Sequence, residues 1–560
     1  MRKLLLWAAV AAAACGSVGL SNARAANKAA IALAGTVTSS QEGRMEGVLV
    51  TAKPDGGTIA ITVVSNEQGR YAFPASRLGP GHYNLKIRAI GYDLIGPQTA
   101  DVTAGGSATA DITLEPTKDL ASQLSNAEWM QSMPGTDAQK HNLWDCSVCH
   151  TLGRIVRSQH TADEFVPLIN RMSLYSQGST PEHPQIKKGK RGSLSDDGSP
   201  FGDSGTVKDA AEWMATINLN GRETWSYALK TFPRPKGNAT KVIITEYDLA
   251  RKDAQPHDVI VDTRGIAWYS DFGSQFIGKL DPVTGKVTDY PVPLIKPDQP
   301  KGILEEEFDK DGNIWLAMMH QGGIARFDVK TETMHVYPLP AELQTDLTQE
   351  SMVEPKSMAV DGKVWTNNQD DHSFLRFDPK TGVWDKLGTY TIPGKNRKLA
   401  SYGIPADKDN NIYVLEYAAD DIARIDAKTK QLKVFYTPTP FSKPRRGEVD
   451  DLGRIWFAEF GANRIGMFDP KTEAMHEWEL PTPWNGPYMA VTDRTGHVWS
   501  GGMLGDRIHR LDPKTGEIVE YLLPRETNVR RVFVQNSTRT PTFWVGNDHG
   551  ASIIKLEPLD

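Results

Sequence analysis

The amino-acid sequence predicts a multidomain, mainly β protein in which a β-sandwich and a small α-helical domain precede a seven-bladed β-propeller. Three observations predict this order. Short β-prone runs broken by Gly and Pro occupy residues 26–116, and amphipathic helical stretches surround a cysteine pair within residues 117–235. One pattern of four short strands then recurs through residues 236–560.

Size and charge limit the function classes that fit. The 560 residues are too many for one hydrophobic core, which favours a division into about three domains. Charged residues make up 24% of the chain and the formal net charge is -6, as in an ordinary globular protein. A basic excess is the usual footprint of nucleic-acid binding. We therefore expect no nucleic-acid partner.

The N-terminus has the pattern of an export signal. Arg2 and Lys3 precede the apolar run Leu4–Ala14, and Ala23-Arg24-Ala25 supplies a small-residue cleavage site. We therefore expect removal of residues 1–25 and export to the periplasm. The apolar run is too short to span a bilayer, and no later segment is apolar enough to do so.

Lipoprotein processing at Cys15 is a less favoured alternative. The preceding residues are Ala12-Ala13-Ala14, whereas the usual lipobox has a larger aliphatic residue at the position of Ala12. Cleavage after Ala25 removes Cys15 and leaves Cys146 and Cys149 as the cysteines of the mature protein. These two thiols would lie in an oxidising compartment, where thiols seldom stay idle.

The region before the cysteine pair contains regularly placed glycines and tyrosines. They occur in Gly69–Phe73, Leu78–Tyr83 and Ala89–Tyr92. In this placement residues 26–116 resemble the carboxypeptidase regulatory-like family. The resemblance implies a transthyretin-type β-sandwich that serves as a spacer or a binding appendage, sometimes for carbohydrate. No cluster of titratable residues occurs here, so we expect a scaffold.

Cys146-Ser147-Val148-Cys149-His150 is the attachment pattern of a c-type haem. Two thiols three residues apart on a helical turn can both reach the porphyrin vinyl groups, and the next residue then presents its imidazole to the iron. A thioredoxin-like redox pair is the alternative, but it does not need His150. A zinc site would require two further soft ligands, and no cysteine remains to supply them. We predict one covalent haem c held by Cys146, Cys149 and His150.

Two helices are predicted after this segment. Thr161–Glu164 is a capping box, followed by an apolar face at Phe165, Leu168, Ile169 and Met172. A second apolar face follows at Ala210, Trp213, Met214 and Ile217, and it resembles the closing helix of cytochromes c in pattern. Residues 117–235 are therefore interpreted as a cytochrome c-like haem domain.

The sixth ligand of the iron stays open. Met172 is the leading candidate, and the others are His160, Met130, Met133 and Met214. Without a side-chain ligand the iron would be five-coordinate and could perform chemistry as well as electron transfer.

Seven repeats follow from about residue 240. An aromatic residue in a short β run recurs at Trp268, Trp315, Trp365, Tyr413, Trp456, Trp499 and Trp544. The turn Asp-Pro-x-Thr-Gly, or a variant, recurs at Asp281, Asp328, Asp378, Asp426, Asp469 and Asp512. Both series advance by 43 to 50 residues, the length of one four-stranded propeller blade.

The ends of the repeat region indicate a closed ring. The seventh repeat stops after its third strand, near Ile553–Leu556, and the missing strand is found before the first repeat, at Ile243–Leu249. Closing the circle with an N-terminal strand would remove exposed sheet edges.

The blade segment Ile455–Gly466 resembles the virginiamycin B lyase family, as does Pro256-His257 followed by Trp268. The resemblance covers roughly residues 240–560 and implies the propeller fold. Lyases of this family use magnesium with His and Glu residues to open a cyclic depsipeptide by elimination. His257, Glu416 and Glu459 match those residue types loosely.

Aligning the repeats on an acid six residues after the start of each innermost strand predicts which residues surround the propeller axis. The predicted ring is His257, Lys301, Lys356, Tyr402, Arg445, Tyr488 and Arg530. Four permanent cations without an acid would repel one another and any magnesium ion. We therefore predict that Lys301, Lys356, Arg445 and Arg530 bind an anionic small molecule.

The same cationic ring should lower the pKa values of Tyr402 and Tyr488. Either phenol would then be a candidate general base, with His257 as a further catalytic candidate.

The favoured interpretation is a periplasmic haem-dependent oxidoreductase or electron-transfer protein, with the anion over the propeller and an unknown electron donor or acceptor. One haem takes one electron at a time and no dinucleotide fingerprint is present, so either a second, unknown cofactor or the iron itself would be the reactive centre. The alternatives are a virginiamycin B lyase-like lyase, and a non-enzymatic redox or binding protein.

Overall fold

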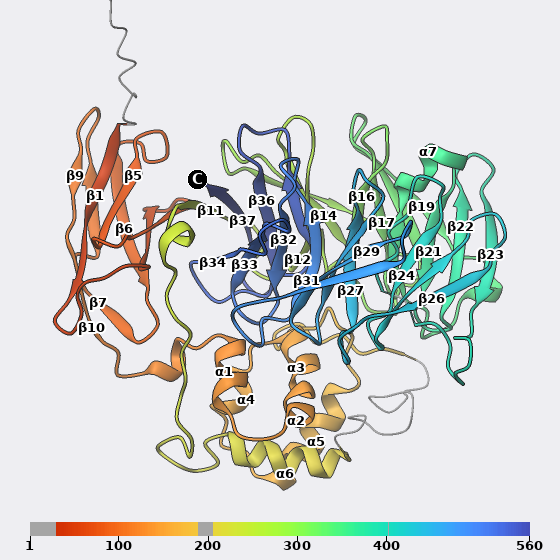
Figure 1. Cartoon of the computed structure of the whole chain (residues 1–560), viewed down its shortest axis with the longest axis horizontal. Helices are drawn as coiled ribbons and strands as arrows, with labels where there is room; N and C mark the ends of the chain where they lie inside the picture. The colour runs from red at the N-terminus through yellow and green to blue at the C-terminus, as the bar shows by residue number, and fades with distance from the viewer. Residues whose placement is uncertain (1–29, 189–204, 401) are drawn as a thin grey trace, which may run out of the picture.

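A computed structural model describes residues 30–188, 205–400 and 402–560. The predicted signal peptide and Cys15 lie outside these residues. Figure 1 shows three parts: a β-sandwich, a group of helices and a large propeller. The predicted mainly β, multidomain architecture with an N-terminal sandwich and a propeller is confirmed. In the described part of the chain, no helix is long and apolar enough to cross a membrane.

The sandwich packs two sheets around a fully buried core. Its first sheet runs β2-β1-β10-β7, with β5 and β9 also paired to β1, and its second runs β4-β3-β6-β8. Leu33, Val50, Phe73 and Ile112 lie in the core. The strands are β1 (Ile31–Ser39), β2 (Gly43–Arg44), β3 (Leu49–Pro54), β4 (Ile59–Val64), β5 (Arg70–Pro74), β6 (Gly81–Arg88), β7 (Tyr92–Gly96), β8 (Thr99–Val102), β9 (Ala108–Thr109) and β10 (Ile112–Pro116).

The helical domain follows directly. Its elements are η1 (Leu120–Ser122), α1 (Asn126–Ser132), α2 (Asp137–His141), α3 (Leu143–Cys149), α4 (Gly153–Val156), α5 (Ala162–Met172) and α6 (Val207–Ile217). The predicted capping box is present, because the Thr161 side chain accepts from the Glu164 N–H and the Glu164 carboxylate accepts from the Thr161 N–H. All four predicted apolar residues of α6 are buried. α5 and α6 pack against each other and close the small core.

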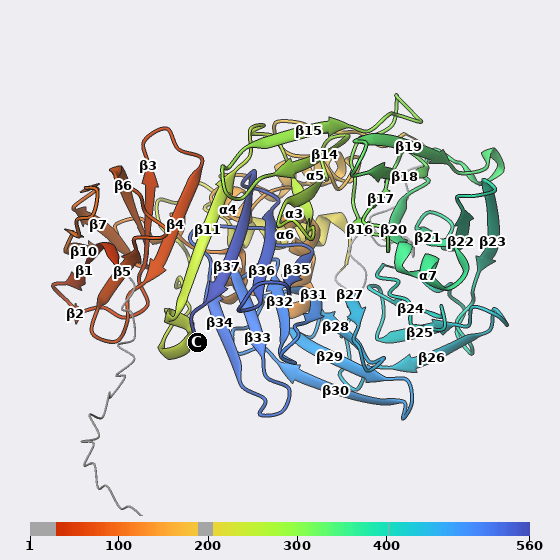
Figure 2. The ribbon, with the colours of Figure 1, turned by 90° about the horizontal axis from the view of Figure 1, so that it is seen from above.

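Seven blades arranged in a ring form the propeller, seen along its axis in Figure 2, and blades 5 and 6 are joined into one sheet through β27 and β31. Blades 1 to 3 contain β12 (Pro256–Val261), β13 (Ala267–Asp271), β14 (Phe276–Leu280), β15 (Val287–Pro291); β16 (Glu306–Phe308), β17 (Ile314–Ala317), β18 (Gly323–Asp328), β19 (Thr333–Pro338); and β20 (Glu350–Glu354), β21 (Val364–Asn368), β22 (Ser373–Asp378), β23 (Val383–Thr389). The turn after β20 contains η5 (Pro355–Ser357) and α7 (Met358–Asp361).

Blades 4 to 7 complete the ring. They contain β24 (Ile412–Leu415), β25 (Asp421–Ile425), β26 (Leu432–Tyr436); β27 (Pro444–Val449), β28 (Ile455–Glu459), β29 (Arg464–Asp469), β30 (Ala474–Glu479); β31 (Pro487–Thr492), β32 (Val498–Gly502), β33 (Arg507–Leu511), β34 (Ile518–Leu522); and β35 (Val532–Gln535), β36 (Thr542–Asn547), β37 (Ser552–Pro558). The ring is closed by β11 (Val242–Asp248), which pairs antiparallel with β37 as predicted.

The closing strand β11 has a second partner that the sequence did not reveal. Its other edge pairs with β4 of the sandwich, in the register Ile243↔Val63 to Tyr247↔Ile59. Blade 7 and one sandwich sheet therefore form one continuous eight-stranded sheet. The ion pair Lys53–Asp248 (2.5 Å) lies beside this junction. The shared ladder fixes the sandwich to the rim of the propeller.

The helical domain covers one face of the propeller, below the blades in Figure 1. The Leu504 carbonyl accepts from the Ala127 N–H (2.9 Å), and Asn528 donates through Nδ2 to the Ser147 carbonyl (2.9 Å). α1 and α3 are thus seated directly on loops that surround the propeller axis.

Candidate functional site at the propeller axis

Strand register identifies the residues that surround the axis next to the helical domain. The blade aromatic residues pair with Ile260, Glu307, Glu354, Glu448, Val491 and Phe533 of the innermost strands, and the Tyr413 amide bonds to the Pro405 carbonyl. The residue three positions before each of these partners belongs to one ring around the axis. This ring, called the mouth ring here, is His257, Leu304, Ser351, Tyr402, Arg445, Tyr488 and Arg530.

Lys301 and Lys356 do not belong to the mouth ring. Leu304 and Ser351 take the positions predicted for them, so the ring has two permanent cations where four were expected. Lys301 is exposed and precedes β16, and its backbone N–H donates to Gln185 of the helical domain (2.8 Å). Lys356 follows β20 in η5, toward the opposite end of the channel. The predicted register is wrong in blades 2 and 3.

A signal for the correct register is present in the sequence. An acidic residue six positions before the blade aromatic accepts a hydrogen bond from it in five blades. The pairs are Asp262 with Trp268, Asp309 with Trp315, Asp407 with Tyr413, Asp450 with Trp456 and Asp493 with Trp499. Counting back from Asp309 places Leu304 in the mouth ring. Blade 3 differs because η5 and α7 replace its tight turn, and Trp365 donates instead to Asn410 of the next blade.

Four innermost strands contain a bulge near the axis, between Pro256/Val259, Glu350/Val353, Pro444/Gly447 and Pro487/Ala490. Bulges re-aim side chains and are common beside functional sites. In blades 1, 5 and 7 the residue after the mouth ring is also buried at the axis: Asp258, Arg446 and Arg531.

These residues form a buried ionic network across the axis. Arg446 binds both oxygens of Asp258 (2.8 and 3.0 Å) and Glu305 (2.5 Å). Arg531 binds Asp258 (3.3 Å) and Glu307. Burial would raise the pKa of Asp258, but Arg446, His257 and Arg531 hold it well below its ordinary value. Asp258, Glu305 and Glu307, which were not predicted to lie here, therefore neutralise Arg446 and Arg531 next to the mouth ring.

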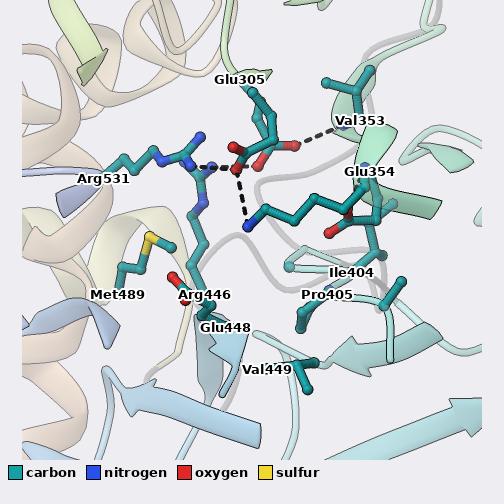
Figure 3. Close-up of a pocket in the computed structure, with 15 residues that line it drawn as sticks. Glu305, Val353, Glu354, Ile404, Pro405, Arg446, Glu448, Val449, Met489 and Arg531 are labelled. Carbon is teal, nitrogen blue, oxygen red and sulfur yellow. Dashed lines mark hydrogen bonds and ion pairs between the residues drawn. The ribbon is translucent and has the colours of Figure 1, made fainter. Parts of the chain in front are cut away.

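Figure 3 shows residues of this network around a cavity. The volume of the cavity is about 50 Å³. Glu305, Glu354, Arg446 and Arg531 line it, and Lys356 reaches Glu307 across it (Nζ–Oε2 3.8 Å). Burial, opposed by Arg446 and Arg531, raises the pKa of Glu305 to about 7, and burial raises that of Glu354 to about 8. The space is large enough for a few water molecules. Lys356 is thus surrounded by carboxylates and is not part of a cationic ring.

The three predicted catalytic candidates are in contact with one another. Asp258 is held ionised by arginines and can only accept, so His257 Nδ1–H donates to it (2.7 Å) and His257 Nε2 accepts from the Tyr488 hydroxyl (3.2 Å). Tyr402 and Tyr488 are hydrogen-bonded through their hydroxyls. The result is one chain of hydrogen bonds from Tyr402 to Asp258.

The predicted lowering of the Tyr402 pKa is wrong. Burial and the neighbouring Tyr488 raise the pKa of Tyr402 well above its ordinary value, and Arg445 and Arg446 only partly oppose this. Burial likewise lowers the pKa of His257 to about 4, although Asp258 opposes it. At neutral pH this chain therefore contains a neutral imidazole and a protonated Tyr402.

The two remaining cations of the mouth ring face the helical domain. The Arg445 guanidinium lies over the rings of Phe460 and Tyr488 (4.4 and 4.5 Å) and forms no ion pair within 4 Å among the described residues. Its Nε is buried without a hydrogen-bond partner there. Arg530 donates through Nη2 to the Val148 carbonyl of α3 (3.1 Å) and lies 3.6 Å from Asp548.

The cysteine pair lies at the end of α3 that touches the mouth ring. Cys146 and Cys149 are both free thiols, and burial raises their pKa values to about 12 and about 11. His150 caps the helix, and its Nδ1–H donates to the Thr151 carbonyl (3.0 Å). This bond fixes the tautomer in which Nε2 has the lone pair, as in metal-ligating histidines. The residues present therefore fit a covalent haem.

The predicted sixth-ligand candidates are dispersed. Met172 is 43% exposed at the end of α5, whereas Met130, Met133 and Met214 are buried in the core of the helical domain. His160 packs edge-on against Phe165. In the described residues no three His, Cys, Asp or Glu side chains are grouped as a metal site.

The residues matched to the lyase chemistry do not form a cluster. His257 contacts Asp258, Tyr488 and Phe272, whereas Glu416 pairs with Arg397 and accepts from the Ala400 N–H. Glu459 is buried, and burial together with Glu477 raises its pKa to about 9. These three side chains have separate partners.

Comparison with known proteins gives two family matches. The virginiamycin B lyase family profile matches residues 386–558, and that of the carboxypeptidase regulatory-like domain matches residues 32–115. No curated protein matches the chain.

Three solved structures are similar to part of the chain. Virginiamycin B lyase from Staphylococcus aureus is 22% identical with a TM-score of 0.48, covering 56% of this chain and 99% of that one. A streptogramin B lyase is 21% identical with a TM-score of 0.48, covering 57% and 99%. The extracellular domain of a hybrid two-component system, BT3049, from B. thetaiotaomicron is 18% identical with a TM-score of 0.43, covering 55% and 40%. The chain thus combines a carboxypeptidase regulatory-like domain with a virginiamycin B lyase-like propeller.

Proposed function

We propose that the chain is an exported c-type haem protein, a periplasmic oxidoreductase or electron-transfer protein that acts on an anionic small molecule at the propeller mouth. The observation that carries the proposal is the seating of the Cys146–His150 segment on the mouth ring. Arg530 and His549 both donate to the Val148 carbonyl, between the two cysteines (3.1 Å each).

Cys146 and Cys149 would hold the haem through thioether bonds, and His150 would ligate its iron. When bound, the haem supplies one-electron redox chemistry. The chain's own residues position it: the Thr151 carbonyl orients His150, and the contacts of Ser147 and Val148 with Asn528 and Arg530 fix the end of α3.

The anion would bind at Arg445. Arg445 is half-buried, and its Nε is buried without a hydrogen-bond partner. Asp145 of α3 interacts with it but forms no ion pair with it within 4 Å, so an anion would supply a direct partner. The rings of Phe460 and Tyr488 pack against the Arg445 guanidinium and hold it in place. The adjacent Tyr488–His257–Asp258 chain can accept a proton at His257, because Asp258 stabilises the imidazolium that would form.

Covalent haem is tested on protein exported by a bacterial host with c-type haem attachment. We expect a haemochrome spectrum and an intact mass that includes haem, both lost in Cys146→Ala/Cys149→Ala. His150→Ala should keep the covalent haem and change the spin state of the iron. A wild-type protein with a Cys146–Cys149 disulfide and no haem would overturn the proposal.

Anion binding is tested by calorimetry of the holoprotein with inorganic phosphate and with sulfate. Arg445→Gln should weaken binding about tenfold, as expected for loss of a charge-assisted contact. The matched control is Arg264→Gln, which removes an exposed guanidinium paired with Asp262. Equal affinities for the two variants would remove Arg445 from the anion site.

The match to the virginiamycin B lyase family favours a magnesium-dependent lyase as a second candidate. The seating of α3 on the mouth ring opposes it, because a large cyclic substrate would have to enter where the helical domain lies. Magnesium-dependent ring opening that persists in the Cys146→Ala variant would establish lyase activity. The haem would then serve a function other than this reaction. Without turnover of either kind, the mouth ring is a docking site of a non-enzymatic redox protein.

The sandwich fits a structural or binding role. Its ladder with blade 7 makes it part of the propeller rim, and we propose that it serves as a scaffold, with carbohydrate as the ligand class to test.

A further inference from the structure

A second pocket lies between the helical domain and blades 5 and 6, away from the ionic network. Its volume is about 700 Å³, within the range of small-molecule sites. His141 and Trp144 of α2 and α3 line one side, and Phe441, Phe460 and Trp484 line the propeller side. Three prolines contribute further apolar surface without backbone N–H groups.

Phe441 and Trp484 occupy equivalent turns of neighbouring blades. Each follows Thr-Pro, and the threonine N–H and hydroxyl donate to a glutamate of the next outer strand, Glu477 for Thr439 and Glu520 for Thr482. Both aromatic residues have a φ of 60°. Bulky residues seldom adopt this left-handed conformation, which persists only where the surroundings impose it. Two blades therefore hold an aromatic residue in the same strained turn at one pocket.

The aromatic rings of the helical domain stack on those of the propeller. His141 stacks on Phe441 with centroids 4.4 Å apart and planes 20° apart, and Trp144 lies 5.7 Å from Phe441 at 29°. Phe441 nevertheless stays 38% exposed. Near-parallel rings with free surface favour a planar partner, since offset stacking is a preferred arrangement of aromatic groups.

Two lysines lie over aromatic rings of the pocket. Lys140 Nζ lies 5.3 Å from the Trp484 ring centroid and Lys443 Nζ lies 4.7 Å from that of Phe441. Neither lysine forms an ion pair in the described part of the chain. Burial lowers the pKa of His141 to about 4, so this imidazole is neutral. Asp137 is the acid near Lys140, and Asp145 and Asp420 are the acids near Lys443. The lining acid Glu479 is paired with Arg464 (2.9 Å).

We infer that this pocket binds a planar aromatic anion, with its rings stacked on Phe441 and Trp484 and its acidic group between Lys140 and Lys443. The stacked wall selects flat ring systems, and the two lysines select carboxylate or sulfonate substituents. The site is centred on Phe441 and Trp484, whereas the anion site of the mouth ring is at Arg445; Phe460 belongs to both. Trp144 and Trp484 also pack in the same cluster as Cys146.

The test is calorimetry of the purified full-length protein with anthraquinone-2-sulfonate, a flat three-ring anion, and with cyclohexanesulfonate, which has the same charge and no aromatic ring. We expect the aromatic probe to bind at least tenfold more tightly. Trp484→Ala and Phe441→Ala should each weaken it about tenfold, and Lys443→Gln should weaken it severalfold and reduce its salt dependence. Trp484→Phe, which keeps a ring and the packing of His141, should retain most of the affinity.

Tyr436→Ala is the matched control, because Tyr436 has Lys395 4.6 Å from its ring centroid on the outer strand β26, outside this pocket. The affinity of the Tyr436→Ala variant for anthraquinone-2-sulfonate should equal that of the wild type. Equal binding of the two sulfonates, unchanged binding by the Phe441→Ala/Trp484→Ala double variant, or no binding by the wild type would each overturn the inference. The outcome is separable from haem attachment, which the haemochrome spectrum reports on the same samples.

Discussion

Arg446 of blade 5 and Asp258 of blade 1 form a two-bond ion pair across the propeller axis, with both side chains fully buried. Asp258 also accepts from His257 and Arg531, so one carboxylate joins blades 1, 5 and 7. The same ionic network therefore contacts the mouth ring at His257 and lines the axial cavity.

Asp258→Asn should destabilise the propeller strongly. Removing one partner of a buried pair leaves uncompensated charge, at a cost of about 3–5 kcal/mol. The measurement is the free energy of unfolding in urea at pH 7. Lys310→Gln, which breaks the exposed pair with Asp311 (2.8 Å), should leave this free energy nearly unchanged. If Asp258→Asn lowers the free energy of unfolding no more than Lys310→Gln does, the buried network does not stabilise the propeller.

Stability should fall in mild acid. Burial lowers the pKa of His257 to about 4, so the unfolded chain takes up a proton below about pH 6.5 that the folded chain refuses. This contribution to the free energy of unfolding is fully present above pH 6.5 and is lost progressively down to about pH 4. At pH 5 the loss is about 2 kcal/mol. His257→Gln should reduce the difference between pH 7 and pH 5. His183→Gln, an exposed control, should leave it unchanged.

Glu459→Gln should stabilise the protein at neutral pH. Burial and Glu477 raise the pKa of Glu459 to about 9, whereas the unfolded chain releases this proton near pH 4.5. Stability therefore falls as pH rises between these values, and the substitution should recover about 2–3 kcal/mol at pH 7. Glu479→Gln on the neighbouring strand β30 is the exposed control. A destabilised Glu459→Gln protein would show that this carboxyl is ionised in the fold.

Amides of β11 should exchange with deuterium slowly. The strand is hydrogen-bonded on both sides, to β37 and to β4, whereas β15 at the outer edge of blade 1 has one neighbour. Hydrogen exchange measured by mass spectrometry should show β11 among the most protected strands and β15 among the least. Similar exchange in both strands would mean that the sandwich detaches readily.

Periodicity carried most of the fold prediction. Seven blade aromatics and the apolar strand at Ile243–Leu249 were sufficient to predict the ring and its closure. The same strand is buried over Val242–Tyr247, a pattern that fits sheet neighbours on both sides, yet its pairing with β4 spans some 180 residues and leaves no periodic signal.

The site was less predictable. Five of seven mouth-ring positions were identified. The error in blade 2 arose although Asp309 keeps the common spacing to Trp315, and the error in blade 3 arose where η5 and α7 replace the tight turn. Neutralisation by Asp258 was missed because a bulge in blade 1 turns a second residue of the strand toward the axis. Glu305, which follows Leu304, was missed together with the register of blade 2. The stacking of Phe441 on His141 joins two domains and cannot be read from either segment alone.

The seating of α3 on the last blade has a consequence for the order of assembly. Asn528 and Arg530 follow Ser147 and Val148 by 381 and 382 residues, so a growing chain exposes Cys146 and Cys149 until nearly all of it has been made. Cofactor attachment thus has a time window that ends when the final blade docks. A chain truncated before β35 should keep both thiols open to alkylation, whereas the full-length apoprotein should protect them.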